Sequence, residues 1–210
     1  MTIVSEQRQF IFIHVPKNAG TSIERALLPW TYFRGQKRLN AIFRKAGLHF
    51  FDQKHFENHV YASEVVQILG LQRFDRYFSF GFVRNPWERC LSLYSYGLDN
   101  LTAPEHSFAI QFKDFSEYLF QRYPRDIKHV CQKDWLFSSE GRQLVKYVGR
   151  YERLKEDFDE VCRRIGVQTS LPELNKSDHK DYRSYFSTKM VEFVADIFAP
   201  DLEAFGYAFE

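Results

Sequence analysis

The sequence is short of cysteine, of net charge and of long hydrophobic runs, and each shortage excludes a class of protein. It has three cysteines, and no two of them form a CxxC pair. A zinc knuckle and a disulfide framework are therefore not indicated, and a reducing compartment is the simpler interpretation. Lys and Arg total 29 against 27 Asp and Glu, a formal net charge of +2. This balance excludes a generic nucleic-acid coat, although positive side chains can still gather locally.

No stretch approaches the roughly 20 apolar residues of a membrane span. Residues 1–8 lack the apolar run of a signal peptide. We therefore expect a soluble, cytoplasmic protein without stable membrane insertion. No repeat, low-complexity tract or linker divides the chain. Its 210 residues are enough for one sizeable domain, which we expect to span residues 1–210.

Aromatic residues are in surplus. The chain has 22 Phe, 12 Tyr and 3 Trp, which make up 18% of its residues. Most of these rings fall at apolar positions of expected strands and helices, so we expect them to fill a compact core. A minority are candidates for stacking on an adenine or sugar ring: Trp30, Tyr32, Trp87, Tyr94 and Trp135.

Apolar runs alternate with helical patterns along the chain. Three runs are typical of buried parallel strands, at residues 9–15, 77–83 and 143–151, the last centred on Val145–Val148. Helical patterns cover residues 21–28, 37–46, 62–69, 86–96, 112–121, 152–165 and 188–198. The alternation predicts an α/β fold, with a P-loop-like parallel β-sheet flanked by helices in a single domain.

The first strand leads into a loop suited to binding an anion. At residues 16–22 the loop enters a helix, whose free N–H groups and dipole favour negative charge. Gly20 permits close approach of the backbone, Thr21 and Ser22 add hydroxyl donors, and Lys17 adds positive charge. In an alternative interpretation, Thr21 or Ser22 merely caps the helix and Lys17 is solvated. The loop is not GxxxxGK[ST], since its lysine precedes the glycine, which disfavours ATP hydrolysis and kinase chemistry.

The second strand ends in a different anion-binding pattern. Arg84 stands at the strand end, where ligands bind in open α/β sheets. Ser92 follows about two helical turns later, so the two side chains are placed to hold one phosphate. Arg89 is a further candidate for this phosphate. Two alternatives stay open: Arg84 pairs with a carboxylate, and Arg89 forms a surface salt bridge with Glu88 or Glu152.

Two segments together resemble the sulfotransferase family that uses 3′-phosphoadenosine 5′-phosphosulfate. They are residues 12–22 (FIHVPKNAGTS) and 82–92 (FVRNPWERCLS). The likeness is to Golgi-type carbohydrate sulfotransferases and their bacterial relatives, including the glycosaminoglycan 2-O-sulfotransferases. Residues 147–158, 174–177 and 201–207 are similar to later motifs of the family. The resemblance implies a sulfotransferase domain over the whole chain.

The resemblance also implies a role for each matching residue. The first loop would grip the 5′-phosphosulfate through Lys17, Asn18, Ala19, Gly20, Thr21 and Ser22. The 3′-phosphate would lie against Arg84 and Ser92. The chain departs from the family at Asn18-Ala19, where relatives often carry Thr-Gly or Thr-Ala. We expect this change to be mild in a loop that binds through its backbone.

Sulfuryl transfer to a hydroxyl needs a stabilised leaving phosphate, in-line positioning and a base. Lys17 is the candidate for the first task, and no metal cluster is evident to share it. Histidine is favoured as the base because its ordinary pKa is near 6.5. His59 precedes an expected helix and resembles the base of the 2-O-sulfotransferase branch, whereas His14 is expected to pack beside Lys17. Glu24 and Glu57 are the alternative bases.

We therefore predict an enzyme that sulfates a hydroxyl of a carbohydrate or similar acceptor and releases adenosine 3′,5′-bisphosphate. Two alternatives stay open: a small-molecule or nucleotide kinase with an atypical phosphate loop, and a non-catalytic nucleotide- or glycan-binding module. Gln132, Lys133 and Trp135 lie in a loop-like stretch that could meet the acceptor. Lys176 and Ser177 could close over the nucleotide.

Overall fold

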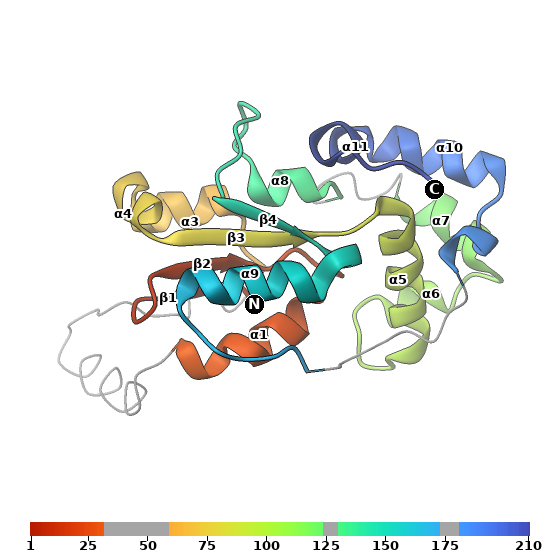
Figure 1. Cartoon of the computed structure of the whole chain (residues 1–210). Coiled ribbons are helices and arrows are strands. Elements are labelled where there is room, and N and C mark those ends of the chain that lie inside the picture. Colours follow the sequence, from red (N-terminus) through yellow and green to blue (C-terminus); the bar gives the residue numbers. More distant parts are fainter. Residues whose placement is uncertain (32–58, 124–129, 173–180) are drawn as a thin grey trace. The chain divides into compact units, whose positions relative to one another are not determined.

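The computed structural model describes residues 1–31, 59–123, 130–172 and 181–210 (Figure 1). The chain divides into two compact units, and each is described by itself. The first unit comprises Met1–Val83 and Trp135–Leu174, and the second comprises Arg84–Asp134 and Asn175–Glu210. Nowhere in the described ranges is a helix both long enough and apolar enough to cross a membrane.

A sheet of four strands lies at the centre of the described part of the first unit. In sheet order the strands are β1 (Ile3–Ser5), β2 (Phe10–Ile13), β3 (Phe78–Val83) and β4 (Tyr147–Arg150). β2, β3 and β4 run parallel, with Phe12 opposite Phe80 and Phe82 opposite Gly149, whereas β1 pairs antiparallel to β2. The predicted α/β fold with a parallel sheet flanked by helices is confirmed.

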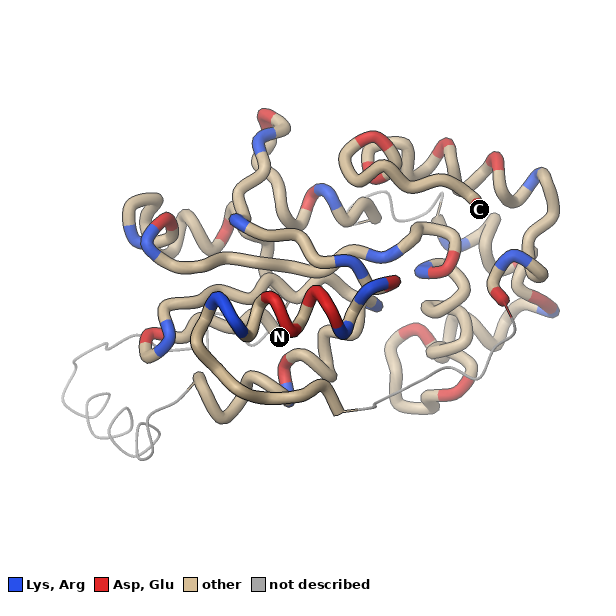
Figure 2. Tube along the Cα trace, in the orientation of Figure 1, with Lys and Arg blue, Asp and Glu red and all other residues tan. Residues whose placement is uncertain are grey.

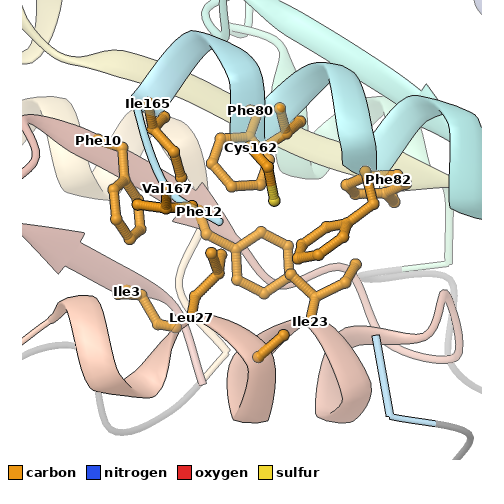
Figure 3. Packing of buried hydrophobic residues seen from close by; sticks show 13 residues of the cluster. Ile3, Phe10, Phe12, Ile23, Leu27, Phe80, Phe82, Cys162, Ile165 and Val167 are labelled. Atoms are coloured by element: carbon orange, nitrogen blue, oxygen red, sulfur yellow. The ribbon is translucent and has the colours of Figure 1, made fainter. Parts of the chain in front are cut away.

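Helices cover both faces of this sheet (Figure 1). The first unit contains α1 (Gly20–Leu27), η1 (Leu28–Trp30), α3 (Ala62–Leu69), α4 (Leu71–Arg76), η3 (Tyr151–Arg153) and α9 (Leu154–Ile165). Alternate strand residues, among them Phe12, Phe80 and Phe82, point toward α1 and α9 and pack with Ile23 and Ile165 (Figure 3). These three Phe side chains are at most 1% exposed, so the aromatic surplus does fill this core.

α9 shows why the sequence pattern predicts this layer well. Its apolar residues pack against the sheet, and charged residues of both signs stand along the same helix (Figure 2). Glu156 and Asp157 lie in the first turn and Arg163 and Arg164 in the last, the order that the helix dipole favours. The helix ends at Gly166, whose φ of 66° is the left-handed angle that glycine adopts most readily.

The described part of the second unit is helical. It contains α5 (Pro86–Asp99), α6 (His106–Ala109), α7 (Phe115–Arg122), η4 (Tyr182–Tyr185), α10 (Thr188–Ile197) and α11 (Ala199–Phe205). Its core includes Trp87, Tyr118 and Phe198, all at most 2% exposed. Trp87, a stacking candidate, is thus a core residue, and its indole N–H donates to the Val191 carbonyl at 3.1 Å.

Several details of the predicted elements are wrong or incomplete. The short strand β1 was not predicted, and α11 follows the helix predicted to be the last. β4 begins later than predicted, because Val145 precedes the strand and pairing starts with Tyr147 opposite Phe80. The stretch interpreted as loop-like forms α8 (Gln132–Leu136). The helix predicted at residues 37–46 lies outside the described residues.

Candidate functional site

The loop between β2 and α1 has an uncommon backbone. Lys17 and Ala19 have φ values of 70° and 59°, in the left-handed region that residues other than glycine rarely occupy. Ala19 is the N-cap of α1, and no side chain caps this helix. The alternative in which Thr21 or Ser22 is the cap is therefore wrong. Backbone N–H groups in alternating left- and right-handed conformations form a concave nest that binds anions.

Asn18 ties this loop to the neighbouring strand. Its side chain is 1% exposed, and its Nδ2 donates to the Phe82 carbonyl at 2.7 Å. The Asn18 side chain therefore holds the loop at the carboxyl end of β3. Of the two hydroxyl residues that follow, Thr21 is exposed and Ser22 is buried.

Residue 20 must be glycine because the His14 ring packs directly against it. A Cβ added to Gly20 would lie 1.9 Å from His14 Nε2. His14 is 7% exposed, and its pKa is lowered to about 2 by burial and by the nearby charges of the Met1 ammonium and His59. The neutral imidazole of His14 thus packs against the loop at Gly20, in agreement with the expectation that His14 is a packing residue.

Replacing Gly20 by alanine should lower the free energy of unfolding by about 3 kcal/mol, because the new methyl group displaces the His14 ring from a packed site. Urea denaturation of both proteins measures the effect. In a His14→Ala background the same substitution should cost less than about 1 kcal/mol, because the ring is gone. Equal costs in the two backgrounds would show that the contact is not responsible.

His59 lies beside His14 at the entry to α3. Its Nδ1 is 3.2 Å from the His14 carbonyl oxygen, and the two ring centroids are 4.5 Å apart. Because a carbonyl only accepts, Nδ1 carries the proton and Nε2 keeps its lone pair. Desolvation lowers the pKa of His59 below its ordinary 6.5, although the side chain is still open to solvent. His59 is therefore neutral at pH 7 and can accept a proton.

Two aromatic side chains stand next to His59. Trp135 stacks on Tyr61 with centroids 4.3 Å apart, and it meets His59 edge-on at 6.0 Å. Trp135 is 4% exposed and lies in α8, so the prediction of a loop at this position is wrong, whereas its contact with the acceptor stays a prediction. Sequence reasoning missed Tyr61, for which the available signal was its position two residues after His59.

The residues predicted to bind the second anion lie in the second unit. Arg84 is 3% exposed, and its Nη2 is 2.9 Å from the Glu88 carboxylate, so the alternative of a carboxylate partner is observed. A guanidinium has five N–H donors, and pairing with Glu88 orients this fork without excluding a phosphate. Ser92 lies on α5 and is 8% exposed. The surface salt bridge considered for Arg89 is wrong, because this residue is buried and donates to the Val130 carbonyl at 2.8 Å.

Some candidates cannot be placed. Tyr32, Glu57, Lys176 and Ser177 lie outside the described residues. In the ranges that the structure does describe, no three His, Cys, Asp or Glu side chains gather into a group that could hold a metal ion.

The first unit thus has an α/β fold in which the loop after β2 contains two left-handed residues, packs on the buried His14 and lies near His59. The chain belongs to the sulfotransferase family, because the family model described as "Sulfotransferase family" matches residues 1–208. The resemblance predicted from the two motifs is thereby confirmed. Membership supports the transfer of sulfate as the activity.

The chain is also similar to individual proteins. The chain is 21% identical over 235 residues to carbohydrate sulfotransferase 14 of Danio rerio, with 98% of this chain and 61% of that protein covered. It is 27% identical over 123 residues to an uncharacterized protein of Archaeoglobus fulgidus, with 55% of this chain and 90% of that one covered. An alignment with the crystal structure of a sulfotransferase from Alicyclobacillus acidocaldarius covers 96% of each chain, at 17% sequence identity and a TM-score of 0.38.

Proposed function

We propose that this protein transfers a sulfuryl group from 3′-phosphoadenosine 5′-phosphosulfate to a hydroxyl of a carbohydrate acceptor, releasing adenosine 3′,5′-bisphosphate. The observation that carries the proposal is the left-handed backbone of Lys17 and Ala19 at the start of α1, with His59 in the same unit. Family membership supports the sulfuryl group. The name of the Danio rerio relative supports the carbohydrate.

In this proposal the 5′-phosphosulfate is assigned to Lys17, to the backbone of residues 18–20 and to the hydroxyl groups of Thr21 and Ser22. The 3′-phosphate is assigned to Arg84 and Ser92. A cytoplasmic location and a single domain over residues 1–210 stay predictions.

The reaction is a single in-line displacement at sulfur. The acceptor oxygen forms a bond to sulfur while the bond between sulfur and the bridging phosphate oxygen breaks, and His59 Nε2 takes the acceptor proton. The electron pair of the broken bond goes to the leaving phosphate. Lys17 and the N–H groups at the start of α1 stabilise that charge, so the proposed step needs no metal ion.

A thermal-shift titration with adenosine 3′,5′-bisphosphate, and with ATP plus magnesium in parallel, tests the donor. We expect the bisphosphate alone to stabilise the protein, by about 2.7 kcal/mol at a concentration of 100 Kd. Arg84→Ala should remove most of this shift, because a charged hydrogen bond to phosphate is lost. Arg183→Ala is the matched control, since Arg183 is exposed and pairs with Asp181 on the surface.

Other outcomes favour the alternatives. Stabilisation by ATP with magnesium, and none by the bisphosphate, would identify a kinase. Bisphosphate binding without transfer of labelled sulfate to any glycan, steroid, phenol or tyrosine peptide would identify a non-catalytic module.

A further inference from the structure

A buried hydrogen-bond chain in the second unit ends on the backbone of Arg84. It starts at Asp201 in the first turn of α11, and the Asp201 side chain is fully buried. The Asp201 carboxylate accepts from the backbone N–H of Gln132 at 2.9 Å and of Lys133 at 2.8 Å. It also accepts from the side-chain Nε2 of Gln132 at 3.2 Å. Asp201 thus fixes both the backbone and the side chain of Gln132.

The Gln132 side chain in turn pairs with both backbone groups of Arg84. Its Oε1 accepts from the Arg84 N–H at 2.8 Å, and its Nε2 donates to the Arg84 carbonyl at 2.8 Å. This is the pattern by which one strand residue pairs with its neighbour in a sheet, supplied here by a side chain. Gln132 is 0% exposed, so both bonds are shielded from water.

Arg84 lies between two regular elements, and its bonds to Gln132 come from a distant part of the chain. It is the first residue after β3, and α5 begins only at Pro86. Gln132 is 48 residues away in the chain and Asp201 is 69 residues from Gln132, so both contacts are tertiary. Glu88 pairs with the guanidinium, whereas Gln132 holds the backbone from which the side chain extends.

We propose that Asp201 and Gln132 are positioning residues that set Arg84 for the terminal 3′-phosphate of the nucleotide. The inference rests on the proposed function, and it assigns to the pair a role in selecting 3′-phosphorylated nucleotides. An arginine displaced by about 1 Å loses the bidentate fit to a phosphate while the rest of the nucleotide site is unchanged. The pair acts through Arg84 and does not touch the ligand.

The test compares the affinities of adenosine 3′,5′-bisphosphate and adenosine 5′-monophosphate, measured by calorimetry on the full chain. The ratio of the two dissociation constants reports the contribution of the 3′-phosphate. Asp201→Asn and Gln132→Leu should each lower this ratio about 10-fold, while monophosphate affinity stays unchanged. In an Arg84→Ala background, Gln132→Leu should lower the ratio no further, because both changes act on one contact.

Tyr118→Phe is the control for lost stability. It removes a buried hydrogen bond from the same unit, donated by the Tyr118 hydroxyl to Glu105 at 2.6 Å, without touching Gln132 or Arg84. This variant should melt at a lower temperature and keep the wild-type ratio. If Asp201→Asn and Gln132→Leu also keep that ratio, the positioning role is overturned. A wild-type protein that does not prefer the bisphosphate would instead overturn the proposed function, so the two failures are distinguishable.

Discussion

Replacing Lys17 by alanine is expected to lower kcat by about 100- to 1,000-fold, the effect of losing one preorganised group that stabilises transition-state charge. The affinity for adenosine 3′,5′-bisphosphate should fall by less than about 10-fold, because the backbone N–H groups of the loop are unchanged. Alanine keeps a Cβ at this left-handed position, so the backbone preference is the same as for lysine. Initial rates with labelled donor and calorimetry with the bisphosphate measure the two quantities.

Lys155→Ala controls for the loss of a positive charge from the same unit. Lys155 is exposed on α9, and its removal should leave kcat unchanged. A Lys17→Ala variant that keeps the wild-type kcat and loses only affinity for the donor would show that Lys17 binds the ground state and the transition state equally. The leaving-group role would then have to pass to the backbone of the loop.

The second large effect concerns His59. His59→Asn should lower kcat by about 100- to 10,000-fold, because the general base is lost. Asparagine is the informative substitution, since its amide can still donate to the His14 carbonyl that His59 Nδ1 contacts. His106→Asn is the matched control, because His106 Nδ1 makes a similar contact with the Gly97 carbonyl at 2.7 Å in the other unit. Its kcat should stay at the wild-type value.

The pH dependence of the rate gives an independent measurement of the same role. A base works only when unprotonated, so kcat/KM should rise with pH through the pKa of His59 and then level off. Desolvation lowers that pKa, which places the rising limb below pH 6.5. The limb should disappear in His59→Asn. If that variant keeps its rate and Glu24→Gln loses it, the base is Glu24.

The two strand–loop–helix segments could be predicted because their signals are local. Pro16 and Gly20 mark the end of one strand and the start of a helix, and Pro86 begins the next helix as expected. The cap of α1 could not be predicted in the same way. Thr21 and Ser22 are common capping residues, but the helix begins one residue earlier, at Gly20 packed against His14, with a left-handed Ala19 at the cap position.

The features that sequence reasoning missed depend on residues distant in the chain. The five residues of α8 are too few to show a helical period, and their first N–H groups bind Asp201, a residue that lies nearly 70 positions later. Arg89 has the pattern of a surface residue, but the Val130 carbonyl binds it in the core. A carboxylate partner for Arg84 could be predicted, and the structure identifies this partner as Glu88, four residues later in the chain.

The edges of the described sheet bear on aggregation. β1 contributes three residues and β4 four, whereas β3, with the sequence FSFGFV, lies between β2 and β4. A segment of this composition is prone to intermolecular strand pairing when its backbone is exposed, and short edges present few N–H and C=O groups to another chain. In the folded sheet the aggregation-prone strand β3 is internal, and the short strands β1 and β4 form the edges. Aggregation through β3 should therefore occur from the unfolded chain. The yield of refolded protein should fall as the protein concentration rises, whereas the native protein should stay dissolved at the same concentrations.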